Sequence, residues 1–134
     1  MSIRHPHTKD FQDRLKRVFD EVDDYLEERY GSLYDLHPAR PPHGATSNKE
    51  HSGLFNVGAS FSAGYGSQFG RGYVLSIEIA TLDRVPDDVE DQIDDDAAAM
   101  IRKLLPREFP GRRLEVTRDG RVFKIHGDLS LGQV

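Results

Sequence analysis

Residues 114–126 read LEVTRDGRVFKIH, and this stretch predicts a β-hairpin. Apolar and polar residues alternate on both sides of Asp119-Gly120, a dipeptide that is common in two-residue turns between antiparallel strands. A turn at this dipeptide places Val116 opposite Phe123, so that two apolar side chains share one face of the hairpin. The same register pairs Leu114 with Ile125 and Glu115 with Lys124.

A second alternating pattern, in residues 54–82, predicts another hairpin. Pairing Phe61 with Leu75 puts the apolar residues of both strands on one face and leaves residues 66–70 as the connecting loop. The opposite face then carries small and polar residues. The further pairs in this register are Ala59 with Ile77, Val57 with Ile79 and, on the opposite face, Gly58 with Glu78.

Two amphipathic helices are predicted, one before the hairpins and one between them. Residues 9–30 carry apolar side chains at steps of three and four, which is the period of a helix with one buried face. Residues 86–105 show the same period, with acids at the start and bases at the end, an order that suits the helix dipole. Pro106 and Pro110 are expected to end the second helix. The stripes are Phe11, Leu15, Val18, Phe19, Val22, Tyr25 and Leu26 in the first helix and Val89, Ile93, Ala97, Met100, Ile101 and Leu104 in the second.

Together these elements predict an α+β fold in the order α-β-β-α-β-β, with two helices packed on one face of an antiparallel sheet. We expect residues 1–134 to form a single domain. Residues 31–53, which include Pro38, Pro41 and Pro42, are expected to be a long irregular loop or arm. A segment of this length is unusual in a compact domain, so it is either a functional lid or a mobile connection.

Composition narrows the class of protein. The formal net charge of −5 disfavours nucleic-acid binding through bulk electrostatics. Because the chain has no cysteine, disulfides, a thiolate nucleophile and a thiolate zinc site are excluded. No apolar run approaches the length of a membrane-spanning helix, and the first ten residues lack the apolar stretch of a secretory signal. We therefore expect a cytoplasmic protein without membrane association.

The most distinctive local feature is the glycine-rich stretch GYGSQFGRGYV, residues 64–74, at the predicted tip of the first hairpin. Glycines let a loop approach a phosphate closely, and Arg71 supplies a positive charge. The spacing matches neither the kinase glycine-rich loop nor the GxxxxGK[ST] phosphate loop. The plainer interpretation is a hairpin tip whose glycines adopt positive φ angles. The candidate ligand-binding residues are Gly66, Gly70, Arg71 and Glu78.

The chain contains no recognised catalytic or metal-binding motif. Gly58-Ala-Ser60-Phe-Ser62 lacks the second glycine of a nucleophile elbow and lies within a predicted strand. The six histidines match no metal-binding spacing, although spacing alone does not exclude ligands supplied by a loop. We expect no metal ion and no cofactor, and we assign no catalytic residue. The histidines of the long loop are His37, His43 and His51.

The second half of the first helix carries acidic residues whose charges are expected to destabilise the helix. Asp23 and Glu27 are like-charged neighbours four residues apart, and acids near the end of a helix oppose its dipole. The simple interpretation is a solvated acidic face. The alternative is that basic residues of the same chain or of a second copy cover it. The other like-charged pairs are Asp20 with Asp24 and Asp24 with Glu28, and the basic candidates are Arg112, Arg113, Arg118 and Arg121.

These features favour a non-catalytic interaction or regulatory module that self-associates, as a homodimer, or binds a protein partner. Small residues at Gly58, Ser60 and Ser62 permit close approach of a second backbone. The alternative is a small-ligand or phosphate-binding enzyme with its site near residues 64–72 and the long loop. Nucleic-acid binding through the basic C-terminal hairpin is a weaker option, because Phe123 falls on the core face and so does not offer a stacking surface.

Overall fold

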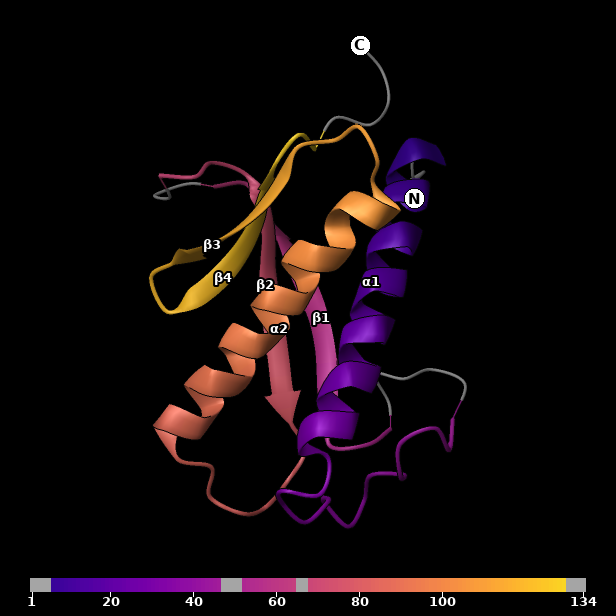
Figure 1. The fold of residues 1–134 in the computed structure, drawn as a ribbon, viewed down its shortest axis with the longest axis vertical. Helices are drawn as coiled ribbons and strands as arrows, with labels where there is room; N and C mark the ends of the chain where they lie inside the picture. The colour runs from indigo at the N-terminus through magenta and orange to yellow at the C-terminus, as the bar shows by residue number, and fades with distance from the viewer. Residues whose placement is uncertain (1–5, 47–51, 65–67, 130–134) are drawn as a thin grey trace.

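The structure, a computed structural model, describes residues 6–46, 52–64 and 68–129. The predicted α+β order is confirmed, because these residues form two helices and four strands in the order α-β-β-α-β-β (Figure 1). The elements are α1 (Pro6–Tyr30), β1 (Phe55–Ser62), β2 (Gly72–Ile79), α2 (Asp87–Glu108), β3 (Leu114–Asp119) and β4 (Val122–Gly127).

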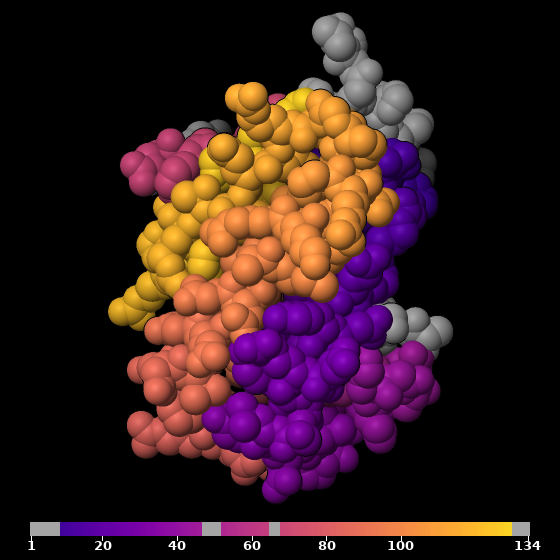
Figure 2. All heavy atoms as spheres, in the orientation of Figure 1, coloured from indigo at the N-terminus to yellow at the C-terminus, as the bar shows by residue number. Residues whose placement is uncertain are grey.

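The four strands form one antiparallel sheet in the order β1-β2-β4-β3, so β1 and β3 are its edges. Both helices lie against the same face of the sheet, as predicted (Figure 1). They cover this face side by side, and residues 31–46 gather below the C-terminal end of α1 (Figure 2). In the described part of the chain, neither helix is long and apolar enough to cross a membrane.

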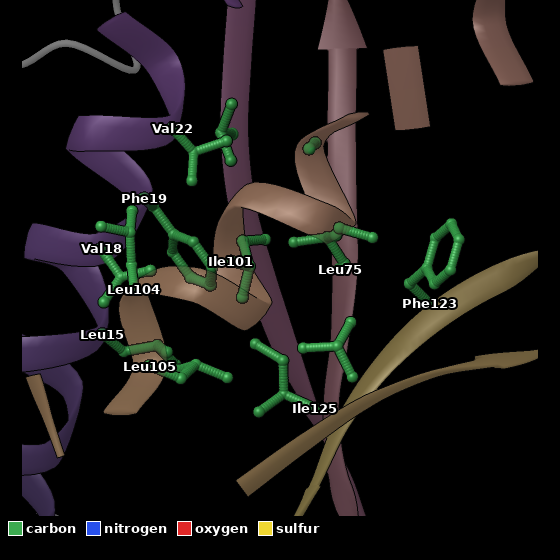
Figure 3. Close-up of a cluster of buried hydrophobic side chains, with 14 of the residues drawn as sticks. Leu15, Val18, Phe19, Val22, Leu75, Ile101, Leu104, Leu105, Phe123 and Ile125 are labelled. Atoms are coloured by element: carbon green, nitrogen blue, oxygen red, sulfur yellow. The ribbon is translucent and has the colours of Figure 1, made fainter. Parts of the chain in front are cut away.

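The core lies between the helices and the sheet. Apolar side chains of α1, α2, β2 and β4 point toward one another in this layer (Figure 3). Each fully buried valine, leucine, isoleucine or phenylalanine side chain stabilises the fold by about 1.5–3 kcal/mol relative to leaving it exposed. The predicted helix stripes supply most of the core. Buried members are Phe11, Leu15, Val18, Phe19, Val22 and Leu26 of α1, and Ile93, Ala97, Ile101 and Leu104 of α2.

The predicted end of the second helix at Leu105, before Pro106, is wrong, and the helix instead ends before Pro110. The helix continues to Glu108, and the backbone N–H of Phe109 still donates a hydrogen bond to the carbonyl of Leu105. Proline lacks only one N–H, so in a last turn it removes one hydrogen bond and leaves few following residues to disturb.

The predicted register of the first hairpin is wrong by two residues. Phe61 pairs with Tyr73, and Leu75 pairs with Ala59. The pairing ends at Ser62 and Gly72, which makes the connection longer than the predicted one. A shift of two residues keeps every side chain on its predicted face, so the alternating pattern alone does not distinguish the two registers. The remaining shifted pairs are Val57 with Ile77 and Gly58 with Ser76.

The predicted turn of the second hairpin is also wrong, by one position. Gly120 and Arg121 form the turn, between the paired residues Asp119 and Val122. Gly120 has a φ of +69°, whereas no described non-glycine residue has a positive φ. A turn at Asp119-Gly120 of the usual hairpin type needs positive φ at both residues, and a glycine at the first turn position avoids that requirement for an aspartate. Val116 therefore pairs with Ile125, Phe123 with Arg118, Leu114 with Gly127, and Lys124 with Thr117 in place of Glu115.

The described part of the long segment is tied to the rest of the fold. The backbone N–H of His37 donates to the carbonyl of Ala80, at 2.8 Å. The N–H of Gly53 donates to the carbonyl of Pro41, also at 2.8 Å, which closes the segment on itself. The described part of this segment therefore has a defined backbone path that packs against one end of α1 and the sheet.

Gly72 provides a test of how tightly β2 and β4 are packed. A Cβ at this position would overlap the carbonyl oxygen of Ile125, whereas a Cβ at Gly58 would meet nothing within 4 Å. We predict that Gly72→Ala lowers the free energy of unfolding by about 1–3 kcal/mol, because backbone must move to admit the methyl group. Gly58→Ala should be neutral or stabilising by about 0.5 kcal/mol, since it reduces only the freedom of the unfolded chain. Urea unfolding of both variants measures the difference, and equal midpoints would contradict this packing.

Candidate functional site

The glycine-rich tip, predicted as a ligand site, folds over one face of β4. Gly70 has a φ of +73°, as the plainer interpretation expected, and its carbonyl accepts a hydrogen bond from the Lys124 ammonium group. Lys124 is only 1% exposed, and its Nζ also lies 3.8 Å from a carboxylate oxygen of Asp119. The aromatic ring of Phe69 lies 5.0 Å from the ring of His126, centre to centre. These contacts hold the described part of the tip against β4.

The predicted site residues do not all come together. Arg71 is exposed next to Gly70, but Glu78 is exposed near the opposite end of β2 and pairs with Asn56. Gly66 lies outside the described residues. The described part of the tip therefore offers Arg71 and backbone groups, without the expected carboxylate.

The long segment lies against the acidic half of α1 at Glu27, whereas Glu21 and Glu28 are exposed. The Arg40 guanidinium donates hydrogen bonds to the carbonyls of Gly53, Ser52 and Phe55, at 2.8–3.2 Å, and so holds the segment against the start of β1. Two of the arginines that the sequence suggested for this role, Arg112 and Arg118, have other partners in the chain. Arg118, for example, pairs with Asp95 of α2 at 3.2 Å.

Glu27 is fixed in place by backbone on three sides. Its Oε1 accepts the N–H of Phe55 at 3.0 Å. A Cβ at Gly31 or Gly53 would overlap the Glu27 carboxylate, so both glycines make room for it. Gly53 also has a φ of +77°, which a residue with a side chain rarely adopts.

Asp23 lies one helical turn before Glu27 and is buried, with 2% of its surface exposed. Its Oδ1 is buried and has no hydrogen-bond partner among the described residues. Burial, reinforced by the neighbouring charges of Glu27, Asp24 and Asp20, raises the pKa of Asp23 to about 7, and Arg40 opposes this shift only in part. A buried carboxyl group without a full set of partners is energetically costly.

His43 brings an imidazole to the same place. Its Nε2 lies 3.0 Å from Oδ1 of Asp24. One ligand atom from each of Asp23, Glu27 and His43 falls within 4.8 Å of the others. We call these three residues the α1–loop cluster. A cavity of about 520 Å³ adjoins it and is lined in part by Glu27, His43, Leu36 and Leu54.

Sequence reasoning missed this cluster as a site. The like-charged neighbours at positions 23 and 27 and the histidines of residues 31–53 were both visible, but no spacing rule connects them. Only the path of the long segment brings His43 back to α1. The available signal was the repulsion between like-charged acids near the end of a helix, for which a cover by other residues was the alternative to a solvated face.

A second cavity, of about 200 Å³, lies between α2 and the turn of the second hairpin. Asp94 lines it, and burial raises the pKa of this carboxyl group to about 6, with further contributions from Glu90 and Asp91. Arg118 lowers the pKa and so offsets part of the shift. The apolar floor of the cavity consists of Leu75, Ile77 and Phe123.

The fold and these features define an α+β protein with two helices on one sheet face and a carboxylate–histidine cluster under a long loop. A family model described as "Uncharacterised protein" matches residues 6–127, and the chain belongs to that family. A relative in Borreliella burgdorferi, described as "Uncharacterized protein", is 42% identical over 118 residues, which are 88% of this chain and 92% of the relative. No solved structure matches the chain.

Asp94 gives a prediction for pH dependence. Because its pKa is raised in the folded state, the folded chain holds a proton that the unfolded chain loses between about pH 4 and pH 6. Stability from this group is therefore present at low pH and is lost as pH rises through the folded pKa. Asp94→Asn should be more stable than the wild type above pH 6, by about 1 kcal/mol, and the difference should shrink toward pH 4. Thermal unfolding at several pH values tests this, and a difference that does not change with pH would contradict it.

Proposed function

We propose that the protein is an interaction module that self-associates as a homodimer through the outer edge of β1. The observation that supports this most directly is Phe61, an apolar side chain near the end of an edge strand that is 59% exposed. Exposed aromatic side chains with a pocket to enter are the usual energetic centres of protein interfaces.

The alternating hydrogen-bond pattern between β1 and β2 leaves some backbone N–H and C=O groups of β1 pointing outward at this edge. The N–H of Ala80 donates to the carbonyl of Leu54, at 2.6 Å, so this pair and every second pair after it carry the bonds between β1 and β2. The intervening residues direct their N–H and C=O groups away from β2. They are Phe55, Val57, Ala59 and Phe61.

Among the described residues, side chains hydrogen-bond to the outward backbone groups of only the first of these positions. Glu27 accepts the N–H of Phe55, and Arg40 donates to its carbonyl. Val57 is buried beside α1, whereas Ala59 is partly exposed and Phe61 is exposed. The open edge therefore begins at Ala59.

Natural edge strands usually carry charges, prolines or bulges that prevent pairing with another chain. β1 has the sequence FNVGASFS, with none of these residues, and its pairing with β2 is continuous. The other edge strand, β3, contains Glu115, Arg118 and Asp119. The contrast points to β1 as the edge that takes up a further strand.

A second copy of the chain fits this edge. With a two-fold axis at Ser60, Ala59 of each copy pairs with Phe61 of the other, and both residues present outward backbone groups. Phe61 of the second copy then lies beside a groove of about 300 Å³ between α1 and β1. This groove is lined in part by Leu15, Phe19, Ala59 and Tyr73.

The alternative, a small-ligand or phosphate-binding enzyme at the glycine-rich tip, has less support. Arg71 is available there, but the Gly70 carbonyl already accepts the Lys124 ammonium group, and Glu78 lies too far along β2 to contribute. A cytoplasmic location and a further protein partner remain predictions from the sequence.

We predict that Phe61→Asp raises the dissociation constant of the dimer at least 30-fold, equivalent to about 2 kcal/mol, because it replaces the exposed aromatic ring at the proposed contact with a charge. Ala59→Pro should also weaken the dimer, since it removes an outward N–H without disturbing the pairs with β2. Sedimentation equilibrium over a wide concentration range measures both effects.

The matched control is Leu82→Asp, which removes an apolar side chain that is 73% exposed and distant from the β1 edge in the sequence. This variant should associate like the wild type. A wild-type chain that stays monomeric at the highest concentration, or a Phe61→Asp chain that dimerises normally, would overturn the proposal.

A further inference from the structure

The α1–loop cluster has the donor atoms of a cation site. Asp23 and Glu27 are four residues apart and project from one side of α1, while His43 approaches from the loop. Donor atoms around a tetrahedral zinc ion lie about 3.4 Å apart, as follows from metal–ligand distances near 2.1 Å. The three ligand atoms here are within 4.8 Å of one another, so modest side-chain rotations bring them to that spacing.

An independent observation points to a ligand at this place. Oδ1 of Asp23 is buried and has no hydrogen-bond partner among the described residues, although it lies within a cluster of polar groups. Buried polar atoms in folded proteins nearly always have a partner, and an exception commonly marks an ion or water. A solvated acidic face, the simple interpretation of the sequence, does not account for a carboxylate that is 2% exposed.

Among the described residues, no cation supplies the missing contact. The Arg40 guanidinium directs hydrogen bonds to the carbonyls of Gly53, Ser52 and Phe55, and Asp23 Oδ1 receives none. A bound divalent cation would contact this oxygen and would offset the repulsion between Asp23 and Glu27.

Two ligands of the cluster are oriented by hydrogen bonds to neighbouring groups, as metal ligands in proteins usually are. The Asp24 carboxylate contacts one ring nitrogen of His43, and metal-binding imidazoles usually have a carboxylate or carbonyl partner on their second nitrogen. Glu27 is oriented by the Phe55 N–H through Oε1, which leaves Oε2 as a donor for a cation. Gly31 and Gly53 keep the space around this carboxylate open.

We propose that Asp23, Glu27 and His43 form a binding site for a divalent transition-metal ion, and that this site binds Zn²⁺ in preference to Mg²⁺ and Ca²⁺. One imidazole nitrogen with two carboxylates suits Zn²⁺ better than Mg²⁺ or Ca²⁺, which take oxygen ligands almost exclusively. Three protein ligands leave a coordination position toward the adjoining cavity of about 520 Å³. The ion links the loop to α1, and this role is independent of self-association at β1.

The test is calorimetric titration of the full chain with ZnCl₂, in a background where His5, His7 and His51 are replaced by alanine. These histidines have side chains outside the described part of the chain and could bind zinc on their own. We expect one Zn²⁺ per chain, bound at least 100-fold more tightly than Mg²⁺ or Ca²⁺.

Asp23→Asn and His43→Ala should each weaken Zn²⁺ binding at least tenfold. His37→Ala is the matched control, because His37 belongs to the same loop and lies outside the cluster. Asp23→Asn keeps the shape of the side chain, and circular dichroism before titration checks that each variant is folded. Glu27→Gln, the variant of the third ligand, should also weaken Zn²⁺ binding. If it unfolds because its contact with the Phe55 N–H is lost, Asp23→Asn and His43→Ala still decide the question.

The absorption spectrum of the Co²⁺-loaded chain gives a second readout. Strong visible bands indicate a four-coordinate site with nitrogen and oxygen donors, and they should disappear in His43→Ala. The proposal is overturned if no metal binds, if Mg²⁺ or Ca²⁺ binds as tightly as Zn²⁺, or if Asp23→Asn and His43→Ala bind Zn²⁺ like His37→Ala.

Discussion

The hydrogen bond from the Phe55 N–H, at the start of β1, to the Glu27 carboxylate of α1 is the contact on which the rest of this structure depends. This N–H is an outward-facing group that no strand covers, and Arg40 completes the cover by donating to the Phe55 carbonyl. These two side chains close one end of the sheet edge and hold the loop against α1. The same contact fixes the position of Glu27 beside Asp23 and His43. Edge protection and the candidate cation site therefore share Glu27.

Residue patterns predicted the elements and their faces, because burial on one face imposes a period of two on strands and of 3.6 on helices. They did not predict the registers. Pairing Phe61 with Leu75 or with Tyr73 places the same apolar residues on the same face, so the pattern is equally satisfied by both. In the second hairpin the choice is made by the turn, where Gly120 takes the positive φ at the first turn position.

The candidate site could be predicted only in part. The acidic half of α1 and the histidines of the long loop were both recognised, but the sequence contains no periodicity from which the path of residues 31–46 follows. Asp23 was expected on an acidic face, yet it is buried, and His43 of the loop lies beside it. Contacts such as that between Arg40 and Gly53 depend on an irregular backbone that only the folded chain defines.

Amide hydrogen exchange tests the central claim most directly, since it reports whether an individual N–H has an acceptor. The account predicts that the Phe55 amide exchanges about as slowly as that of Asn56, which lies in a hydrogen-bonding pair with Glu78 of β2. In Glu27→Ala the Phe55 amide should become fast while the Asn56 amide stays slow. A Phe55 amide that already exchanges rapidly in the wild-type chain would contradict the account.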